Sequence, residues 1–430
     1  MTRFILSDLR RLWAGSLVVV LLIAFATALG VAVTLQERAL RLGSARAADH
    51  FDLVVGAPGS ETQLLLSSIF LQPSPLPLMP GDVLGKLAAD PRVSWAAPVG
   101  FGDSFSGYPT VGTSTALVGN LSALSEGRSF STAGEAVIGA AVSLPLGYAV
   151  KPMHGTAGGD THTELAYRIT GRLAPTGTSW DRAILVPIQA VWGLHGMGAH
   201  DHEAEEAHAD KPAGDTARAP GTEAAHHDDD HGHGEHDAID PDAPLDEHWT
   251  AETPGLPAIL VKPKTIADAY KLRQDYRGNG TLAVFPGEVL TNLYATLGDA
   301  KRVLSAVAVG AQILVAAAVL MVTVMHIGQR RRQIGALRAF GAPQSAVLAI
   351  VWLELFILIA LGILSGFAIG YGAALLLSAM VSGESGIVLP VGFTRDDLKS
   401  VIAIVLFSAI LALAPALLAY RQSPAAALRA

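Results

Sequence analysis

Two long apolar runs with a short cationic segment between them constrain this chain more than any other feature. The runs cover residues 303–327 and 346–379, and each exceeds the roughly 20 residues that a helix needs to cross a bilayer. The segment between them holds no acidic residue and four arginines: Arg330, Arg331, Arg332 and Arg338. Because short loops rich in Lys and Arg stay on the cytoplasmic side of a membrane, we expect this loop to be cytoplasmic.

Two further apolar runs bring the expected number of crossings to four. The first begins at residue 14 and is too long for the apolar core of a secretory signal, so we interpret it as an uncleaved membrane helix. Arginines near both chain ends then place both termini in the cytoplasm. The expected boundaries are 1–13 for an amphipathic cytoplasmic N-terminus, 14–35, 301–327, 346–379 and 401–420 for transmembrane helices 1 to 4, 36–300 for a periplasmic domain with stalk helices, 328–345 for a cytoplasmic coupling loop, 380–400 for a short periplasmic loop and 421–430 for a cytoplasmic tail.

The large outer region between the first two helices has the pattern of an α/β domain. Short runs of β-branched and aliphatic residues end at turn residues, and we expect strands at 51–55, 93–99, 136–139, 167–173, 183–187, 258–262 and 282–285, with helices at 63–71 and 266–276. The predicted fold class is therefore membrane α-helical with four transmembrane helices, plus an α/β extracytoplasmic domain inserted between helices 1 and 2. A leucine stripe from Leu290 to Leu304 favours a stalk against the extension of the first helix, although an ordinary packing helix is an alternative.

A histidine-rich segment interrupts the outer domain. Ten of the 14 histidines lie between His195 and His248, where 16 acidic residues face two basic ones; the local charge is −14 against −8 for the whole chain. This composition cannot bury a core, so we expect a disordered insertion over 195–250. Imidazoles beside carboxylates suit zinc, with nickel or copper as competitors. The candidate ligands are His200, His202, His226, His227, His231, His233 and His236.

Other interpretations of this segment remain open. A solubilising acidic spacer explains the carboxylates, and a pH sensor explains the histidines. His154 and His162 are further candidate ligands or ordinary loop histidines. A metalloenzyme is disfavoured because no His-Glu-x-x-His pattern is present, and the absence of cysteine excludes a thiolate metal site.

The cationic loop also carries a motif. Its residues 331–342 resemble the Arg-x-Glu-Ile-Gly-x-Leu-Arg-Ala-x-Gly-Ala loop of the FtsX/MacB-like permeases, the type VII ABC transporter permeases, with Gln333 where glutamate is usual. Pro415, Ala419 and Pro424 resemble the C-terminal ending of that family. The histidine-rich insertion is similar to that of FtsX-like permeases in zinc-responsive gene clusters. The residues expected to couple to an ATPase are Arg331, Arg332, Ile334, Gly335, Leu337, Arg338 and Gly341.

This resemblance implies a homodimer in the bacterial inner membrane that binds a separate cytoplasmic ABC ATPase. The chain itself has no nucleotide-binding motif, since Gly81 to Lys86 has the wrong spacing for a P-loop. We therefore expect no enzymatic activity, no tightly bound cofactor, ATP only through the partner ATPase, and zinc at the His-rich loop. A periplasmic metal-binding protein, a lipoprotein and an outer-membrane protein are candidate further partners, and no nucleic acid is expected.

Two functions follow from the same resemblance. One is an ABC permease that moves its periplasmic domain and handles zinc or another divalent metal. The alternative is FtsX-like mechanotransmission, in which the stroke activates a periplasmic cell-wall hydrolase or releases a lipoprotein.

Glu354 is a further candidate site residue, because a carboxylate inside a membrane span is costly unless it is paired or faces the bundle interior. A polar anchor or dimer contact is the alternative. Gly362, Gly366 and Gly370 form a ladder that allows close helix packing.

Overall fold

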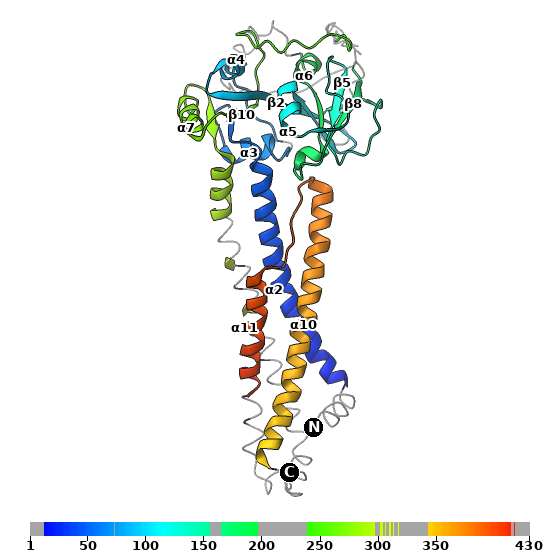
Figure 1. Ribbon diagram of the computed structural model, residues 1–430, viewed down its shortest axis with the longest axis vertical. Coiled ribbons are helices and arrows are strands. Elements are labelled where there is room, and N and C mark those ends of the chain that lie inside the picture. The colour runs from blue at the N-terminus through cyan, green and yellow to red at the C-terminus, as the bar shows by residue number, and fades with distance from the viewer. Residues whose placement is uncertain are drawn as a thin grey trace, which may run out of the picture. The chain divides into compact units, whose positions relative to one another are not determined.

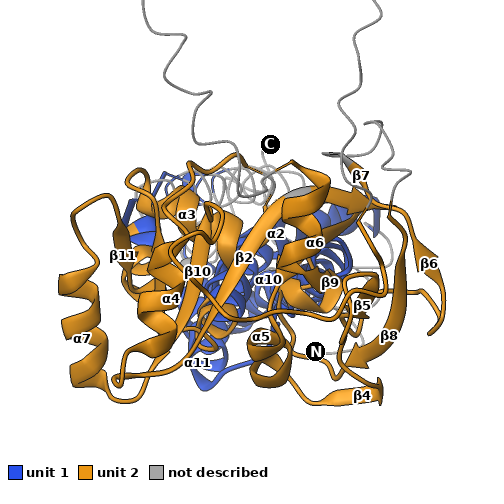
Figure 2. Cartoon of the chain, turned by 90° about the horizontal axis from the view of Figure 1, so that it is seen from above, with its two compact units in different colours: residues 1–44, 293–384, 388–430 blue, residues 45–292, 385–387 orange. Residues whose placement is uncertain are grey.

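The computed structural model of the chain describes residues 13–72, 74–154, 165–196, 239–296 and 343–413, together with isolated positions between 302 and 317 and residue 417. The chain divides into two compact units, which Figure 2 colours separately. We call Met1–Ser44, Leu293–Glu384 and Val388–Ala430 the helical unit. Ala45–Asn292 with Ser385–Ile387 forms the sheet unit.

The sheet unit is built on one mixed sheet of eleven strands (Figure 1). The strands are β1 (Leu53–Gly56), β2 (Val93–Phe105), β3 (Tyr108–Thr113), β4 (Leu124–Gly127), β5 (Glu135–Ile138), β6 (Ala149–Val150), β7 (Met153–His154), β8 (Tyr167–Leu173), β9 (Ile184–Pro187), β10 (Ala258–Pro263) and β11 (Leu282–Val284). Their order is β11-β1-β10-β2-β3-β9-β5-β8-β4, with β6 paired to β8 and β7 to β2. Two pairs are parallel, β3 with β9 and β5 with β8, and the others are antiparallel.

Short helices cover this sheet, and several begin at a capping residue that the sequence supplies. Ser60 accepts a hydrogen bond from the Gln63 N–H at the start of α3, and Thr265 accepts one from the Asp268 N–H at the start of α7. Such caps satisfy backbone donors that the first helical turn leaves unpaired. The helices of the sheet unit are α3 (Glu61–Ser68), α4 (Asp82–Ala89), α5 (Thr115–Leu121), the 3₁₀ turn η1 (Ser179–Arg182), α6 (Ile188–Leu194) and α7 (Ile266–Asp275).

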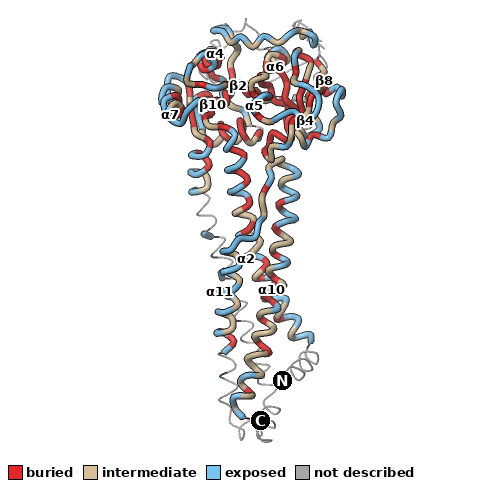
Figure 3. The backbone as a smooth tube through the Cα atoms, in the orientation of Figure 1, coloured by how far each residue is buried: buried red, intermediate tan, exposed pale blue. Residues whose placement is uncertain are grey.

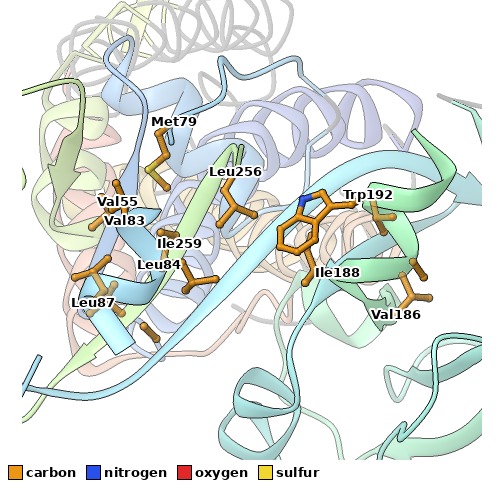
Figure 4. Close-up of a cluster of buried hydrophobic side chains, with 14 of the residues drawn as sticks. Val55, Met79, Val83, Leu84, Leu87, Val186, Ile188, Trp192, Leu256 and Ile259 are labelled. Carbon is orange, nitrogen blue, oxygen red and sulfur yellow. The ribbon is translucent and has the colours of Figure 1, made fainter. Parts of the chain in front are cut away.

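The core of the sheet unit lies between these helices and the sheet. Fully buried aliphatic residues from α4, β1 and β10 meet residues of β9 and α6 in one cluster (Figure 4). Burial is concentrated in this unit, as the tube of Figure 3 shows. Hydrophobic burial contributes about 25 cal/mol for each Å² of apolar surface removed from water, so this cluster is the main source of the unit's stability.

The α/β character predicted for the outer domain is confirmed. β1, β2, β5, β8, β9, β10 and β11 overlap the seven expected strands, and α3 and α7 overlap the two expected helices. The sequence pattern did not reveal α4, β3, α5, β4, β6, β7 or α6. β2 also runs further than expected, because it continues through Phe105 into the turn to β3.

Residues 239–256 form an ordered strap across the sheet unit, and this corrects the expected boundaries of the disordered insertion at 195–250. The Gly134 N–H donates to the Pro241 carbonyl at 2.8 Å, and the Thr115 N–H donates to the Glu247 carboxylate at 2.6 Å. The strap ends where Leu256 exchanges backbone hydrogen bonds with Met79. Its apolar positions are spaced among polar ones, so composition alone did not distinguish it from the histidine-rich residues before it.

The helical unit contains three long helices among the described residues: α2 (Trp13–Ala48), α10 (Gln344–Ser385) and α11 (Arg395–Leu411). Two of the described helices are long and apolar enough to cross a membrane, Trp13–Ala48 and Ser345–Ser385. α10 has 42 residues and is about 63 Å long, so it exceeds the thickness of a bilayer. It ends at Ser385, which shortens the loop expected at 380–400. The expected crossing at 301–327 lies mostly outside the described residues.

Candidate functional site

Three charged side chains are buried in the described part of the chain: Asp103, Asp181 and Glu354. Moving a carboxylate out of water is costly unless it gains hydrogen bonds or a cation. Each of the three therefore marks a place where the fold holds a charge for a structural or functional reason, and the first two lie in the sheet unit.

Asp181 organises a tight turn at residues 176–182. Its carboxylate accepts hydrogen bonds from the Thr176 N–H and hydroxyl, both at 2.7 Å, and from the Gly177 N–H at 2.8 Å. The neighbouring Trp180 side chain is fully buried. A carboxylate that accepts three hydrogen bonds fixes the backbone around it, so this turn is a rigid part of the sheet unit.

Two segments adjacent to long helices pack on this turn within the sheet unit. Phe51, three residues after the end of α2, contacts Trp180 with ring centroids 5.9 Å apart. Gly386 follows α10 directly and has φ +75°, and a Cβ built there lies 3.1 Å from both the Thr178 carbonyl oxygen and Arg182 Cγ. Any larger residue at Gly386 would therefore be both strained and crowded. The turn therefore contacts both the segment that follows α2 and the segment that follows α10.

Glycines of α10 bring it against α2 in the helical unit. A Cβ built on Gly366 lies 2.4 Å from the Ala24 carbonyl oxygen. A Cβ built on Gly370 lies 2.6 Å from the Ala28 carbonyl oxygen, and one built on Gly362 lies 2.7 Å from Ile23 Cβ. The glycine ladder is therefore used within the chain, where small residues let two helix backbones approach closely.

An ion pair joins α2 to α11 in the same unit. Arg38 donates to both carboxylate oxygens of Asp397, at 2.7 and 2.8 Å. Asp397 also accepts from the Thr394 N–H in a capping box at the start of α11. The Arg38 guanidinium holds the pKa of the Asp397 carboxyl well below its usual range, and the Thr394 hydrogen bonds contribute. Bidentate Arg–carboxylate pairs combine energy with fixed geometry, so the pair sets the register of these helices.

The extension of α2 also meets the next ordered segment of the helical unit. The hydroxyls of Ser44 and Tyr294 lie 2.5 Å apart, and the Tyr294 hydroxyl is 3.3 Å from the Leu40 carbonyl oxygen. This contact lies where the stalk is expected, and packing by the leucine stripe stays a prediction. Leu297 and Leu304 of the expected leucine stripe lie outside the described residues.

Glu354, the candidate intramembrane residue, is 7% exposed on α10. Close to it in the sequence, the Trp352 indole N–H donates to the Ala409 carbonyl at 2.9 Å and Leu355 belongs to an apolar cluster of the helical unit. Its carboxylate is therefore shielded within the helical unit, as expected for an acidic residue that faces a bundle interior.

His195 and Asp103 form a second charged pair, in the sheet unit. His195 follows α6, and its Nε2 lies 3.5 Å from Asp103 Oδ1, while its Nδ1 lies 2.9 Å from the Val191 carbonyl oxygen. The Asp103 side chain is 2% exposed and that of His195 is 18% exposed. The Asp103 carboxylate raises the pKa of His195, and the Val191 carbonyl adds to this effect.

The ends of the histidine-rich segment meet next to this pair. Gly193, two residues before His195, has Ile239 Cδ1 only 2.8 Å from the position of a built Cβ. Ile239 also packs on the core of the sheet unit. Gly193 and Ile239 therefore lie in contact, although residues 197–238 separate them in the sequence.

The other predicted site residues lie outside the part of the chain that the structure describes. They are the coupling residues Arg331, Arg332, Ile334, Gly335, Leu337, Arg338 and Gly341, and the histidines His200, His202, His226, His227, His231, His233 and His236. Among the described side chains, no group of three or more His, Asp or Glu residues could hold a metal ion.

Sequence reasoning missed several residues that the structure brings forward, notably Arg38, Asp397, Asp103 and Asp181. Arg38 and Asp397 are 359 positions apart, so no local pattern connects them. For Asp181 the available signal was local: the Thr-Gly-Thr-Ser-Trp-Asp run that ends at this residue is rich in the small and hydroxyl residues of turns.

Comparison with known proteins adds one match. Residues 305–424 match the family model described as the FtsX-like permease C-terminal domain. No curated protein matches the chain significantly. The matched region includes the cationic loop, α10 and α11, and the two apolar helices agree with a membrane protein. Residues 305–424 are therefore similar to the C-terminal domain of FtsX-like permeases, and this region contains the cationic loop whose motif resembles that family.

Proposed function

We propose that this chain is the membrane subunit of an ABC transporter, in which ATP hydrolysis by a separate cytoplasmic ATPase moves the sheet unit. The proposal places the chain in the bacterial inner membrane as a homodimer, with both termini in the cytoplasm and the sheet unit in the periplasm. The FtsX-like match supports the permease assignment. The arginines of the 328–345 loop support its cytoplasmic side.

The observation that carries the proposal is the turn at residues 176–182. It packs on Phe51, which follows α2, and on Gly386, which follows α10. Both connections are short and one is fixed by a buried aromatic contact. A displacement at either helix end would therefore pass into the sheet unit through packed atoms, because densely packed interiors transmit strain.

A divalent metal is the second part of the proposal. The histidine-rich segment joins the sheet unit at α6 and at the strap, so any metal that it bound would be attached to the part of the molecule that moves. A sequence that interleaves imidazoles with carboxylates favours several weak zinc sites with fast exchange. The cargo of the transporter would then be zinc or a zinc-loaded protein.

The same turn favours a second candidate function. A sheet unit that moves as one body could instead activate a periplasmic cell-wall hydrolase or release a lipoprotein. The ATPase and its genomic neighbours separate the two candidates: an adjacent hydrolase favours activation, and an adjacent zinc-binding or outer-membrane protein favours transport.

The test begins with the coupling loop. We expect Leu337→Asp in the full chain to abolish copurification with the ATPase encoded beside it, because a carboxylate replaces an apolar side chain that would enter the ATPase groove. Ile266→Asp is the matched control: Ile266 lies in the sheet unit and is 79% exposed, so the same exchange there should leave copurification intact. Retained binding by Leu337→Asp would refute the coupling assignment.

A further inference from the structure

A proline-rich segment connects α3 to α4 on the surface of the sheet unit. Residues 74–80 have the sequence Ser-Pro-Leu-Pro-Leu-Met-Pro. Each proline fixes its own φ at about −65°, and it also pushes the residue before it towards extended backbone. These two effects together restrict every residue of the segment except Leu78. The sequence therefore favours the polyproline II conformation, a left-handed helix with about three residues per turn.

The burial of this segment repeats in threes, as that conformation requires. Residues 74–78 belong to no helix or strand. Leu76 and Met79, three positions apart, lie on the inner side: Leu76 is half-buried, and Met79 is 1% exposed. The other four residues of 75–80 are exposed: Pro75, Pro77, Leu78 and Pro80.

The four exposed residues form two pairs at the same spacing. Pro75 and Leu78 are three positions apart, and so are Pro77 and Pro80. In a helix with about three residues per turn, each pair lies along one edge. The segment therefore presents two neighbouring apolar ridges to solvent, and Leu78 is 53% exposed on one of them.

Both ends of the segment are fixed to the sheet unit. The side-chain amide of Gln63, on α3, donates to the Ser74 hydroxyl at 2.7 Å and to the Pro75 carbonyl at 2.9 Å. Met79 and Leu256 exchange backbone hydrogen bonds of 2.8 and 2.9 Å, and both side chains belong to the buried cluster of Figure 4. Because the segment is already ordered, it loses little conformational entropy when a partner binds it.

The chemistry of the exposed side indicates the kind of partner. Proline has no N–H, so the segment cannot join a partner's sheet as a regular strand. The carbonyl oxygens of Leu76, Pro77 and Leu78 accept no hydrogen bond from the described residues, and indole N–H and phenol O–H groups are suitable donors to them. Residues 72–81 have no charged side chain. Proline-rich segments of this kind dock into grooves lined by aromatic side chains.

We propose that residues 75–80 are a docking site for a periplasmic protein with a groove lined by tryptophan and tyrosine. The aromatic rings of the partner pack against the two ridges, and their N–H and O–H groups donate to the carbonyls between the ridges. The sheet unit thereby attaches a second protein to itself. This inference goes beyond the proposed function, from which it takes only the periplasmic location of the sheet unit.

Photocrosslinking of the full chain in intact cells tests the site. The photoreactive residue p-benzoylphenylalanine replaces Leu78, and irradiation should give one discrete adduct with another protein. Mass spectrometry of the adduct should place the crosslink in a groove that contains tryptophan or tyrosine. Pro77→Ala combined with Pro80→Ala should reduce the adduct at least fivefold, because one ridge is lost.

A second variant tests whether the fold holds the segment ready for binding. Gln63→Ala removes the anchor at one end and leaves both ridges unchanged, so it should reduce the adduct about threefold. The partner found in the adduct, once purified, should bind the full chain in detergent at least tenfold more tightly than it binds a synthetic peptide of residues 72–82. The free peptide must be ordered on binding, whereas the segment in the fold is ordered already.

The chain offers two matched controls. Pro244 is exposed and lies three positions after Pro241, but burial around it alternates in twos from residue 243 to residue 250, as in a strand. Pro244→Ala should therefore leave the adduct unchanged. The photoreactive residue in place of Ile266, which is 79% exposed in the same unit, should not capture the same protein. Thermal midpoints of all variants report folding.

Three outcomes would overturn the docking site. They are no adduct above the Ile266 control, an adduct only with lipid or with a second copy of this chain, and a full adduct yield from the double proline variant. The photocrosslink needs no ATPase, whereas Leu337→Asp tests ATPase coupling alone. Failure of the docking site is therefore distinguishable from failure of the proposed function.

Discussion

The two units of this protein solve the same packing problem in opposite ways. The sheet unit buries large aliphatic and aromatic residues, among them Leu84 and Trp180, in an interior closed by strand hydrogen bonds. The helical unit brings backbones together at glycines and leaves large apolar side chains outside: Phe25 is 74% exposed and Leu376 is 69% exposed. In lipid, apolar side chains gain little from burial, so close backbone contact provides the packing energy. Small residues therefore stabilise the helical unit through close backbone contact, and large buried residues stabilise the sheet unit.

Enlarging one glycine of the ladder tests most directly whether small residues hold α10 against α2. Gly366→Leu should give the largest effect, a destabilisation of about 3 kcal/mol or more, because α10 must move away from the Ala24 backbone. The yield of monodisperse protein in detergent and its thermal midpoint report this loss. Gly372→Leu is the control, since Gly372 lies on the same helix with nothing within 4 Å of its built Cβ. Equal behaviour of the two variants would contradict the ladder.

The polar contacts of the helical unit should have an intermediate effect. Arg38→Ala removes a bidentate pair whose side chains are only 21% and 11% exposed, and we expect a loss of about 1–2 kcal/mol after allowance for solvent screening. Lys399→Ala removes an ion pair whose side chains are 75% and 81% exposed and should be nearly neutral. Thermal unfolding at low and high salt compares them; a neutral Arg38→Ala would show that glycines alone hold α2 in place.

The smallest expected effect is a pH dependence in the sheet unit. Arg128 lowers the pKa of Glu135 from 4.5 to about 2, and hydrogen bonds from Ser131 contribute. Because the pKa falls on folding, this stabilisation is present above pH 4.5 and is lost as the pH falls towards 2. Glu135→Gln should lower the thermal midpoint by about 2–4 °C at pH 7. Near pH 2 it should leave the midpoint unchanged.

Glu126→Gln is the control for this prediction. Glu126 lies 3.7 Å from Arg172 and its side chain is 59% exposed, so the exchange should leave the midpoint nearly unchanged. A Glu135→Gln effect that is independent of pH would exclude the Arg128 pair as its cause.

The sequence predicted those helices and strands that depend on a local pattern of apolar residues. Long apolar runs predicted α2 and α10, and short β-branched runs predicted seven of the strands but missed β3, which lies in the middle of the sheet. The ends of α10 could not be read in this way, because Ser382 to Ser385 are polar enough to resemble a loop yet remain helical. The number of transmembrane helices stays a prediction, since 301–327 lies mostly outside the described residues.

The site residues were less predictable because their partners are remote in the sequence. Asp103 and His195 meet only after β2 and α6 have packed together, and no spacing rule connects them. Glu354 is conspicuous in the sequence as a single carboxylate in an apolar run, and its functional role stays a prediction. The histidine-rich composition pointed to metal binding but concealed the strap after Ile239, whose role depends on hydrogen bonds to Gly134 and Thr115.

The contact between Gly193 and Ile239 has a consequence for how such a protein can change over time. Because the fold already holds both ends of the histidine-rich segment together, the closure entropy of that segment is nearly independent of its length, and each doubling costs only about 0.6 kcal/mol. Histidines can therefore be gained or lost there without endangering the sheet. The segment can therefore change in length and composition over evolution while the sheet unit stays the same.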